Sequence, residues 1–311
     1  MKLLVTKNFS DEKMKMLEDL GYTIVFHDDR CLENTSEINE VDVAYVYHNT
    51  DRLDYTQMKN LKMLQLASVG FDHIPKDYFV EKGIILSNNK GGYSIPMAEF
   101  IVMSILEVYK NKKQFFKKQE GKRWKMDFSL LELNGKKAGI LGTGDIGIET
   151  AKRLKAFGVE VWGLNTSGRE VENFDRCLPS DKIDELLSEC DIVIGLMPST
   201  KSTQGLMNAD KFEIMKDGSV LVNAGRGSLI NLSDLEKYAE KFRGIVLDVF
   251  EEEPLSSESK LWEIDNVLIT PHNSWVSDGN EERLFENVYK NLKSFIETGK
   301  PERKVEIKKG Y

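Results

Sequence analysis

Residues 138–147 read AGILGTGDIG and carry the pattern G-x-G-x-x-G at the point where a predicted strand, residues 137–141, runs into a predicted helix, residues 146–157. A second strand is predicted at residues 159–164. In such a unit the first glycine permits a tight turn, the second lets a ligand reach the backbone, and the third lets helix and strand pack closely. The pattern therefore predicts a parallel βαβ unit in which a phosphate group binds at the start of the helix.

Short β-rich runs alternate with amphipathic helical runs along most of the chain, which is typical of parallel sheets covered by helices. A chain of 311 residues usually divides into two domains. We expect one domain at residues 1–92 plus 277–311 and a second at residues 93–276, joined through long helices rather than through a flexible linker. Further strands are predicted at residues 3–6, 23–26, 41–45, 63–66, 84–86, 191–196, 219–223, 245–249 and 267–270, and helices at residues 11–20, 94–118, 233–242 and 278–298.

The composition excludes several classes of protein. It is 41% hydrophobic and 30% charged, as in globular proteins, and the net charge of −8 disfavours nucleic acid or an anionic membrane as a partner. The longest apolar run, residues 100–106, is too short to span a membrane. Three cysteines without a C-x-x-C pair predict neither a disulfide framework nor a metal site, so we expect a cytoplasmic protein.

The glycine pattern favours a dinucleotide cofactor. A glycine-rich turn also exists in proteins without any ligand, but here the strand before it, the helix after it and the next strand all stand where a dinucleotide site requires them. The helix start offers free amide groups and the positive end of its dipole to a pyrophosphate. The candidate contacts are Gly142, Gly144, Asp145, Ile146 and Gly147.

The end of the following strand bears on which dinucleotide binds. Enzymes that use NAD usually place an acidic residue there, to bind the ribose hydroxyls. This chain instead has Asn165, Thr166, Ser167 and Arg169, whose hydroxyl and guanidinium groups suit the additional phosphate of NADP. We therefore expect NADP(H) to be favoured over NAD(H). The alternative is a polar turn whose arginine points to solvent.

Three later segments follow predicted strands and carry ionisable residues. They are NAGRG at residues 223–227, DVFEEEP at residues 248–254 and TPH at residues 270–272. Open α/β sheets bind ligands at the carboxyl ends of their strands, so these segments are candidates for a shared site.

These segments together resemble the D-isomer-specific 2-hydroxyacid dehydrogenases, whose N-A-x-R-G, D-V-F-x-x-E-P and T-P-H elements appear here in order. The resemblance extends from the segment SVGFD at residues 68–72 to the last helix. It implies an α/β fold of two doubly wound parallel-sheet domains, a Rossmann cofactor domain and a smaller flavodoxin-like substrate domain. It also implies an enzyme that moves a hydride between NAD(P)H and a small 2-keto or D-2-hydroxy acid, with a catalytic triad of Arg226, Glu253 and His272.

The chemistry of the residues supports that triad independently. The planar cation of Arg226 can hold a carboxylate and polarise a carbonyl group. A histidine such as His272 is a natural donor of the proton that a new alkoxide needs, and a neighbouring carboxylate such as Glu253 favours its charged form and fixes its tautomer. Taken singly, each residue has a plainer interpretation as a surface arginine, one of three solvated glutamates, or a helix-capping histidine.

The resemblance implies further contacts. The backbone amides around Val69 and Gly70 are expected to bind the substrate carboxylate, Asp248 to contact the nicotinamide carboxamide, and Ala224 to face the nicotinamide ring. Pro198 completes the expected cofactor contacts.

The substrate's side chain is expected to face the loop at residues 47–50, which is neutral apart from His48, and the indole of Trp275. This predicts that an apolar 2-keto acid is preferred over a phosphorylated one. The tryptophan also resembles that of the C-terminal-binding protein corepressors, so a dinucleotide-sensing binding protein with weak catalysis is the alternative function.

A homodimer is expected through residues 94–118, because the apolar positions of this segment occupy more than one helix face.

Overall fold

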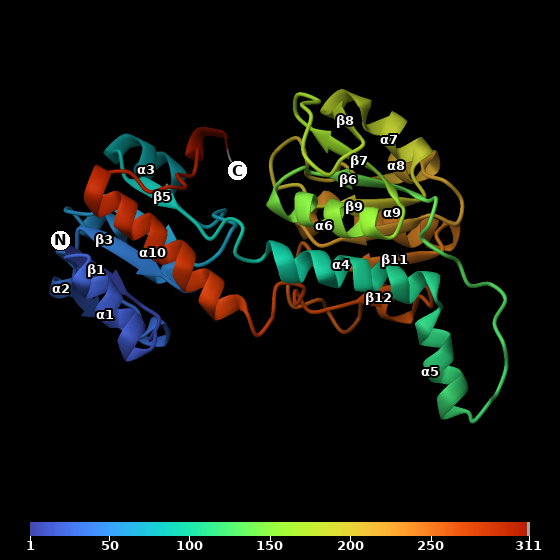
Figure 1. Cartoon of the computed structure of the whole chain (residues 1–311), viewed down its shortest axis with the longest axis horizontal. Coiled ribbons are helices and arrows are strands. Elements are labelled where there is room, and N and C mark those ends of the chain that lie inside the picture. The colour runs from blue at the N-terminus through green and yellow to red at the C-terminus, as the bar shows by residue number, and fades with distance from the viewer. Residues whose placement is uncertain (310–311) are drawn as a thin grey trace. The chain divides into compact units, whose positions relative to one another are not determined.

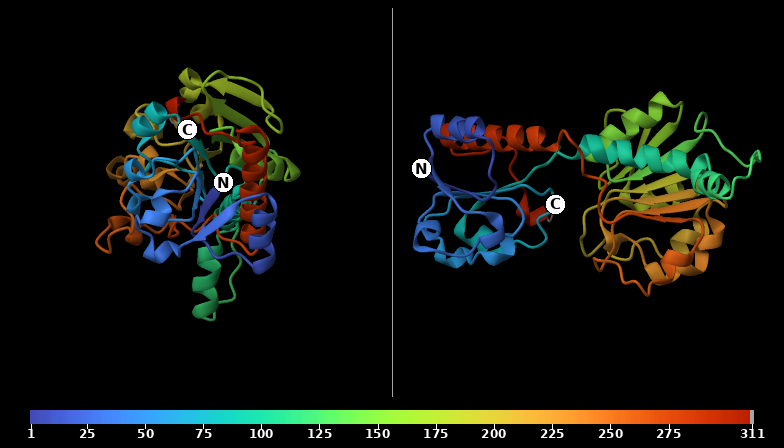
Figure 2. Two further views of the ribbon diagram at one scale, coloured as in Figure 1. Left: turned by 90° about the vertical axis from the view of Figure 1, so that its left-hand side faces the viewer. Right: turned by 90° about the horizontal axis from the view of Figure 1, so that it is seen from below.

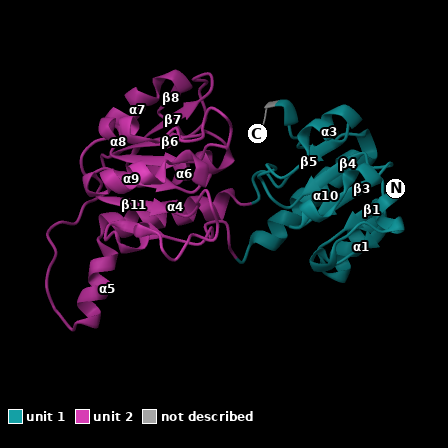
Figure 3. Cartoon of the chain, turned by 180° about the vertical axis from the view of Figure 1, so that it is seen from behind, with its two compact units in different colours: residues 1–92, 278–311 teal, residues 93–277 magenta. Residues whose placement is uncertain are grey.

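The computed structural model describes residues 1–309, which form two compact units (Figure 3). The first comprises Met1–Gly92 and Asp278–Tyr311, whose last two residues, 310 and 311, lie outside the described part. The second comprises Tyr93–Ser277. The expected division differed only in assigning residue 277 to the first unit.

The first unit is built on a parallel sheet of five strands in the order β2-β1-β3-β4-β5. This is the order of flavodoxin-like folds, as expected for the smaller domain. Its elements are β1 (Lys2–Val5), α1 (Asp11–Asp19), β2 (Thr23–Phe26), α2 (Ser36–Asn39), β3 (Val43–Val46), β4 (Met63–Leu66), α3 (Lys76–Lys82), β5 (Ile85–Ser87) and α10 (Asn280–Thr298).

Helices cover both faces of this sheet, because successive side chains of a strand point to opposite faces. Leu3 and Val5 of β1 belong to a core cluster with Leu292 of α10. Leu4, between them, belongs to a different cluster with Phe79 of α3. Figure 2 accordingly shows α1 and α10 on one side of the sheet and α3 on the other.

The second unit contains a parallel sheet of seven strands in the order β12-β11-β10-β9-β6-β7-β8. Counted from β6, this is the doubly wound dinucleotide-binding order with one strand added at the β11 edge, as expected for a Rossmann domain. Its elements are α4 (Ser94–Tyr109), α5 (Lys112–Glu120), β6 (Lys137–Leu141), α6 (Asp145–Ala156), β7 (Glu160–Asn165), β8 (Arg176–Pro179), α7 (Ile183–Glu189), β9 (Ile192–Gly195), α8 (Ala209–Ile214), β10 (Val220–Asn223), α9 (Leu232–Tyr238), β11 (Gly244–Leu247) and β12 (Val267–Ile269).

The second sheet is also buried on both faces (Figure 1). Ile140 of β6 packs in a cluster with Ile105 of α4 and Leu154 of α6. The next residue, Leu141, packs in the opposite cluster with Phe212 of α8. The strand order reverses between β6, β7 and β9, and this reversal places the carboxyl end of β6 at the switch point where such folds bind ligands.

The expectation of a single helix at residues 94–118 is wrong. The chain leaves α4 at Tyr109, and α5 begins at Lys112, because Asn111 between them adopts a left-handed conformation with φ of 49°. Helix α5 has no buried residue and, with the segment after it, extends from the rest of the unit (Figure 1).

None of the helices within residues 1–309 is long and apolar enough to cross a bilayer.

Candidate active site

The glycine turn after β6 is held by close packing of backbone on backbone. Gly142 has a φ of 113°, and a side chain there would lie 2.9 Å from the carbonyl oxygen of Leu196. Its amide donates to the carbonyl of Leu164, over 3.0 Å. A Cβ on Gly147 would lie 2.4 Å from the Gly142 carbonyl oxygen. Both glycines are therefore required by the fold of the turn itself.

Gly144 differs from these two glycines. An added Cβ would meet no protein atom within 4 Å, so packing within the protein does not explain the glycine. Gly144 also occupies the N-cap of α6, so the capping residue has no side chain that could accept a hydrogen bond from the first turn. An open space beside the start of a helix is what a pyrophosphate needs, so these residues fit the dinucleotide.

The turn after β7 is organised by its first residue. The side chain of Asn165 accepts hydrogen bonds from the amides of Ser167 and Arg169, at 3.3 and 3.1 Å, and donates to the Arg169 carbonyl at 2.9 Å. The side chains of Thr166, Ser167 and Arg169 are exposed. Asn165 therefore shapes the turn, and its neighbours supply the groups that face outward.

Arg226 follows β10 in a loop whose shape depends on Asn223. The Asn223 amide group donates to the Arg226 carbonyl at 3.0 Å and accepts from the amide of Gly225 at 3.3 Å. The half-buried Arg226 side chain donates to the Gly225 carbonyl at 2.9 Å. Ala224, expected to face the nicotinamide ring, is 2% exposed and packs in the core.

Gly227 brings this loop against the next one. A Cβ on Gly227 would lie 1.9 Å from the carbonyl carbon of Phe250 and 2.3 Å from the amide nitrogen of Glu251. Only glycine allows two backbones to approach this closely. The Arg226 loop is thus fixed against the segment that carries the predicted glutamate.

Glu253 and His272 form a direct pair. The Nδ1 atom of His272 lies 2.8 Å from Oε2 of Glu253, and the other carboxylate oxygen accepts from the amide of Phe250 at 2.9 Å. Glu253 is thereby held at both oxygens and orients the imidazole, whose Nε2 takes no part in this pair. His272 has a φ of 51°, and its amide donates to the carbonyl of Asp248 at 2.8 Å.

Asp248 organises the segment that contains His272. Its carboxylate is fully buried and accepts hydrogen bonds from the Thr270 hydroxyl at 2.6 Å, the Asn273 amide at 2.8 Å and the Ser274 amide at 3.1 Å. The sequence indicated only a contact to the nicotinamide carboxamide. In the structure Asp248 links the ends of β11 and β12 and so sets the position of His272.

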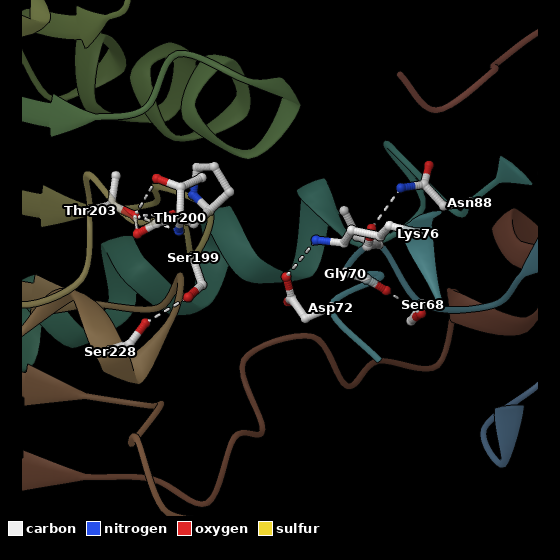
Figure 4. A network of polar contacts seen from close by, with 11 residues as sticks. Ser68, Gly70, Asp72, Lys76, Asn88, Ser199, Thr200, Thr203 and Ser228 are labelled. Carbon is white, nitrogen blue, oxygen red and sulfur yellow. Dashed lines mark hydrogen bonds and ion pairs between the residues drawn. The ribbon is translucent and has the colours of Figure 1, made fainter. Parts of the chain in front are cut away.

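Trp275 lies in the same segment, and its own contacts hold it there. Its indole donates to the carbonyl of His272 at 2.9 Å, and its ring packs edge to face on Tyr93 with centroids 5.3 Å apart. The structure gives it a packing role beside His272. Pro198, after β9, accepts a hydrogen bond at its carbonyl from the Thr203 hydroxyl at 2.6 Å, and Ser199 bonds Ser228 at 3.0 Å (Figure 4).

In the first unit, the predicted carboxylate-binding turn follows β4. Its carbonyl groups are all engaged: Ser68 accepts from the Asn89 amide at 3.0 Å, Val69 from the Asn88 side chain at 2.6 Å, and Gly70 from the Ser68 hydroxyl at 2.7 Å (Figure 4). The amide groups of Val69 and Gly70, by contrast, donate to no group among residues 1–309. Carbonyls turned away and amides left available make a concavity suited to an anion.

The loop after β3, residues 47–50, is fixed by a residue that the sequence did not single out. Buried Asp29 accepts hydrogen bonds from the amides of His48 and Asn49, at 3.0 and 3.3 Å, and from the Thr6 hydroxyl at 3.1 Å.

Within the described residues, no group of three or more His, Cys, Asp or Glu side chains is placed to share a metal ion.

The comparisons with known proteins agree with this arrangement. A family model described as "D-isomer specific 2-hydroxyacid dehydrogenase, NAD binding domain" matches residues 102–274. The chain is 33% identical over 280 residues to a D-3-phosphoglycerate dehydrogenase of Archaeoglobus fulgidus, covering 88% of this chain and 53% of that one, so it spans about half the length of that relative.

Two other proteins match over nearly their whole length. A glyoxylate reductase of Pyrococcus horikoshii is 30% identical over 312 residues, covering 94% of this chain and 92% of its own. The crystal structure of D-lactate dehydrogenase from Aquifex aeolicus, complexed with NAD and lactic acid, superposes with a TM-score of 0.77 at 30% identity and 96% coverage of both chains. The chain therefore belongs to the family of NAD(P)-dependent D-isomer specific 2-hydroxyacid dehydrogenases.

Proposed function

We propose that this chain catalyses reversible hydride transfer between NAD(P)H and the C2 position of a small 2-keto acid. The observation that carries the proposal is the pairing of His272 with Glu253 at 2.8 Å, on a segment that backs directly onto the Arg226 loop. One unit thus provides a proton donor, a partner that orients it and a cation at the carboxyl edge of one sheet.

The roles follow from the hydrogen bonds already made. Because Nδ1 of His272 is bound to Glu253, Nε2 is the atom that gives a proton to the alkoxide in reduction and removes it in oxidation. The guanidinium of Arg226 binds the substrate carboxylate and polarises the carbonyl. For the first unit we propose that the amides of Val69 and Gly70 bind a carboxylate.

The dinucleotide's pyrophosphate would be held by residues 142–147, and its adenosine ribose by residues 165–169. When bound, the nicotinamide supplies or accepts the hydride. We favour NADP(H) because the exposed Thr166, Ser167 and Arg169 present donors and a cation, with no acid at the end of β7. In that case Arg169→Ala lowers kcat/KM for NADPH but not for NADH, whereas removing the adjacent exposed acid with Glu170→Ala leaves the NADPH value unchanged or higher.

The activity is tested by following NADPH and NADH oxidation with a panel of 2-keto acids. His272→Gln should lower kcat by about 10²–10⁴ while nucleotide affinity, measured by fluorescence titration, stays within about threefold. The chain offers a matched control, His27→Gln, since His27 also faces a glutamate, Glu37, at 3.6 Å. A parent protein that binds nucleotide but turns over no 2-keto acid would instead be the dinucleotide sensor.

We also propose a homodimer, built on the segment after α4 rather than on one long helix. Helix α5 and the residues following it expose large apolar side chains that no other part of residues 1–309 covers, and a second copy of the chain would bury them. Light scattering should show a dimer for the parent and a monomer for Trp124→Ser combined with Phe128→Ser. The side chains concerned are Phe116, Trp124, Met126 and Phe128.

A further inference from the structure

A lysine lies at the carboxyl end of the first unit's sheet, beside the loop that the sequence presents as neutral. Lys7 follows β1, and its ammonium nitrogen is 4.6 Å from the ring centre of Tyr47, in the loop after β3. The Lys7 side chain is 18% exposed. Its one ion pair within the described residues is a long one, 3.8 Å to Glu281, whose side chain is 55% exposed. Such a pair is weak and leaves the cation able to take a better partner.

Buried Asp29 forms no ion pair with Lys7 among the described residues. Asp29 uses its carboxylate to accept hydrogen bonds from the Thr6 hydroxyl and from the amides of His48 and Asn49. The Thr6 hydroxyl in turn accepts from the amide of Tyr47 at 2.8 Å. These bonds hold the ends of β1 and β3 together. They therefore fix the backbone of Tyr47, whose ring contacts the Lys7 ammonium group.

The imidazole of His48 adds little charge at neutral pH. Burial lowers its pKa, and the nearby Lys7 ammonium lowers it further, against an opposing effect of Asp29. Of Lys7 and His48, it is therefore Lys7 that carries a positive charge at neutral pH.

The strand order relates Lys7 to the predicted carboxylate-binding turn. Strands β1, β3 and β4 are successive neighbours (Figure 3), so Lys7 and the turn at Val69 and Gly70 lie at the ends of strands two positions apart. Two strand spacings amount to about 10 Å. The ammonium group of Lys7 stands on a flexible four-carbon stem, so it and the amides of Val69 and Gly70 can bind the two anionic groups of one acid when a few carbon atoms separate those groups.

We propose that Lys7 binds the second anionic group of a 2-keto acid whose first carboxylate occupies the amides of Val69 and Gly70. This inference rests on the proposed function and names its substrate class: 2-keto acids with a carboxylate or phosphate at the far end. It replaces the expectation of an apolar side chain, which was based on the neutral loop and on the indole of Trp275 and did not consider the strand beside the loop.

The test compares kcat/KM for 2-ketoglutarate and 3-phosphohydroxypyruvate with that for 2-ketoisocaproate. The parent should prefer at least one of the two acids with a second anionic group, and the better of them identifies whether carboxylate or phosphate is bound. Lys7→Met, which keeps most of the stem and removes the charge, should lower kcat/KM for the preferred acid by about 10- to 100-fold, mainly through KM. The value for 2-ketoisocaproate should stay within about twofold.

The chain provides a close control in Lys13, on α1. Its ammonium group also pairs with a glutamate of α10, Glu282 at 2.8 Å, and lies over an aromatic ring, Phe285 at 5.3 Å. Lys13→Met should leave the ratio of the two kcat/KM values unchanged. If Lys7→Met folds poorly, Lys7→Arg provides the complementary measurement, since it keeps the charge and should keep the preference.

Three results would overturn the inference. One is a parent enzyme that prefers 2-ketoisocaproate to both acids. Another is a preference that survives in Lys7→Met. The third is a preference lost in Lys76→Met instead, since Lys76 is another cation near the turn, over the ring of Phe71. Absence of turnover with every 2-keto acid would overturn the proposed function itself, whereas turnover without this discrimination overturns only the role of Lys7.

Discussion

The substitution Gly144→Ala distinguishes the effect of position 144 on folding stability from its effect on dinucleotide binding. In the structure an added Cβ meets nothing within 4 Å, and the backbone angles of Gly144, φ −80° and ψ −169°, are ones that alanine adopts without strain. Gly144→Ala should therefore fold normally. Alanine restricts the unfolded chain more than glycine does but is the poorer N-cap residue, so the free energy of unfolding should change by less than about 1 kcal/mol.

The same methyl group should weaken dinucleotide binding. It would occupy the space through which a phosphate oxygen reaches the start of α6. Loss of one hydrogen bond to a charged group costs about 1.5–3 kcal/mol, which corresponds to about a 10- to 150-fold increase in the dissociation constant. The substitution is thus expected to change stability less than it changes nucleotide affinity.

Urea denaturation measures the first quantity, and calorimetric titration with NADPH and NADH measures the second. Gly147→Ala is the matched control, since its Cβ would lie 2.4 Å from the Gly142 carbonyl oxygen and should destabilise the protein by about 1–3 kcal/mol. If Gly144→Ala binds both nucleotides within threefold of the parent, the pyrophosphate does not lie where the structure leaves room for it.

Three further outcomes are expected. Gly227→Ala must push the Arg226 loop away from Phe250, and a displacement of about 1 Å should lower kcat/KM about 100-fold with little change in nucleotide affinity. Asp248→Ala leaves three donors without their acceptor and should lower the free energy of unfolding, measured in urea, by about 3–5 kcal/mol. Burial raises the pKa of the Cys190 thiol to about 12, so at pH 8 a thiol reagent should label exposed Cys31 in the native protein and Cys190 only after denaturation; prompt labelling of Cys190 would show that this core opens readily.

The alternation of strands and helices was predictable because most strands in a doubly covered sheet are continuous apolar runs. The strand β8, Arg176–Pro179, was missed because it is an edge strand bearing an arginine and a proline, and it pairs only with β7. The break between α4 and α5 was missed for another reason. Asn111 donates a hydrogen bond to Asp127 at 3.0 Å, a contact from beyond α5 that local periodicity does not reveal.

Some of the candidate site residues could be identified from the sequence and others could not. Arg226, Glu253 and His272 were identifiable as candidates because each stands in a short motif after a strand. The structural role of Asp248 and the position of Lys7 were not, since both depend on which strands are neighbours. A lysine or aspartate beside a strand looks in sequence like any solvated charge, and only the strand order shows what it meets.

The first unit is built from two segments that lie far apart in the sequence, so its parts are synthesised at different times. Helix α10 covers the sheet face formed by Leu3, Val5 and Tyr45, yet its residues are synthesised about 190 positions after β5. At the usual rates of translation that interval lasts about 10–40 s. Throughout it, this apolar face of the nascent sheet is covered by α1 but not by α10, which makes it a natural target for molecular chaperones. A ribosome stalled before residue 280 should therefore carry an unfinished first unit.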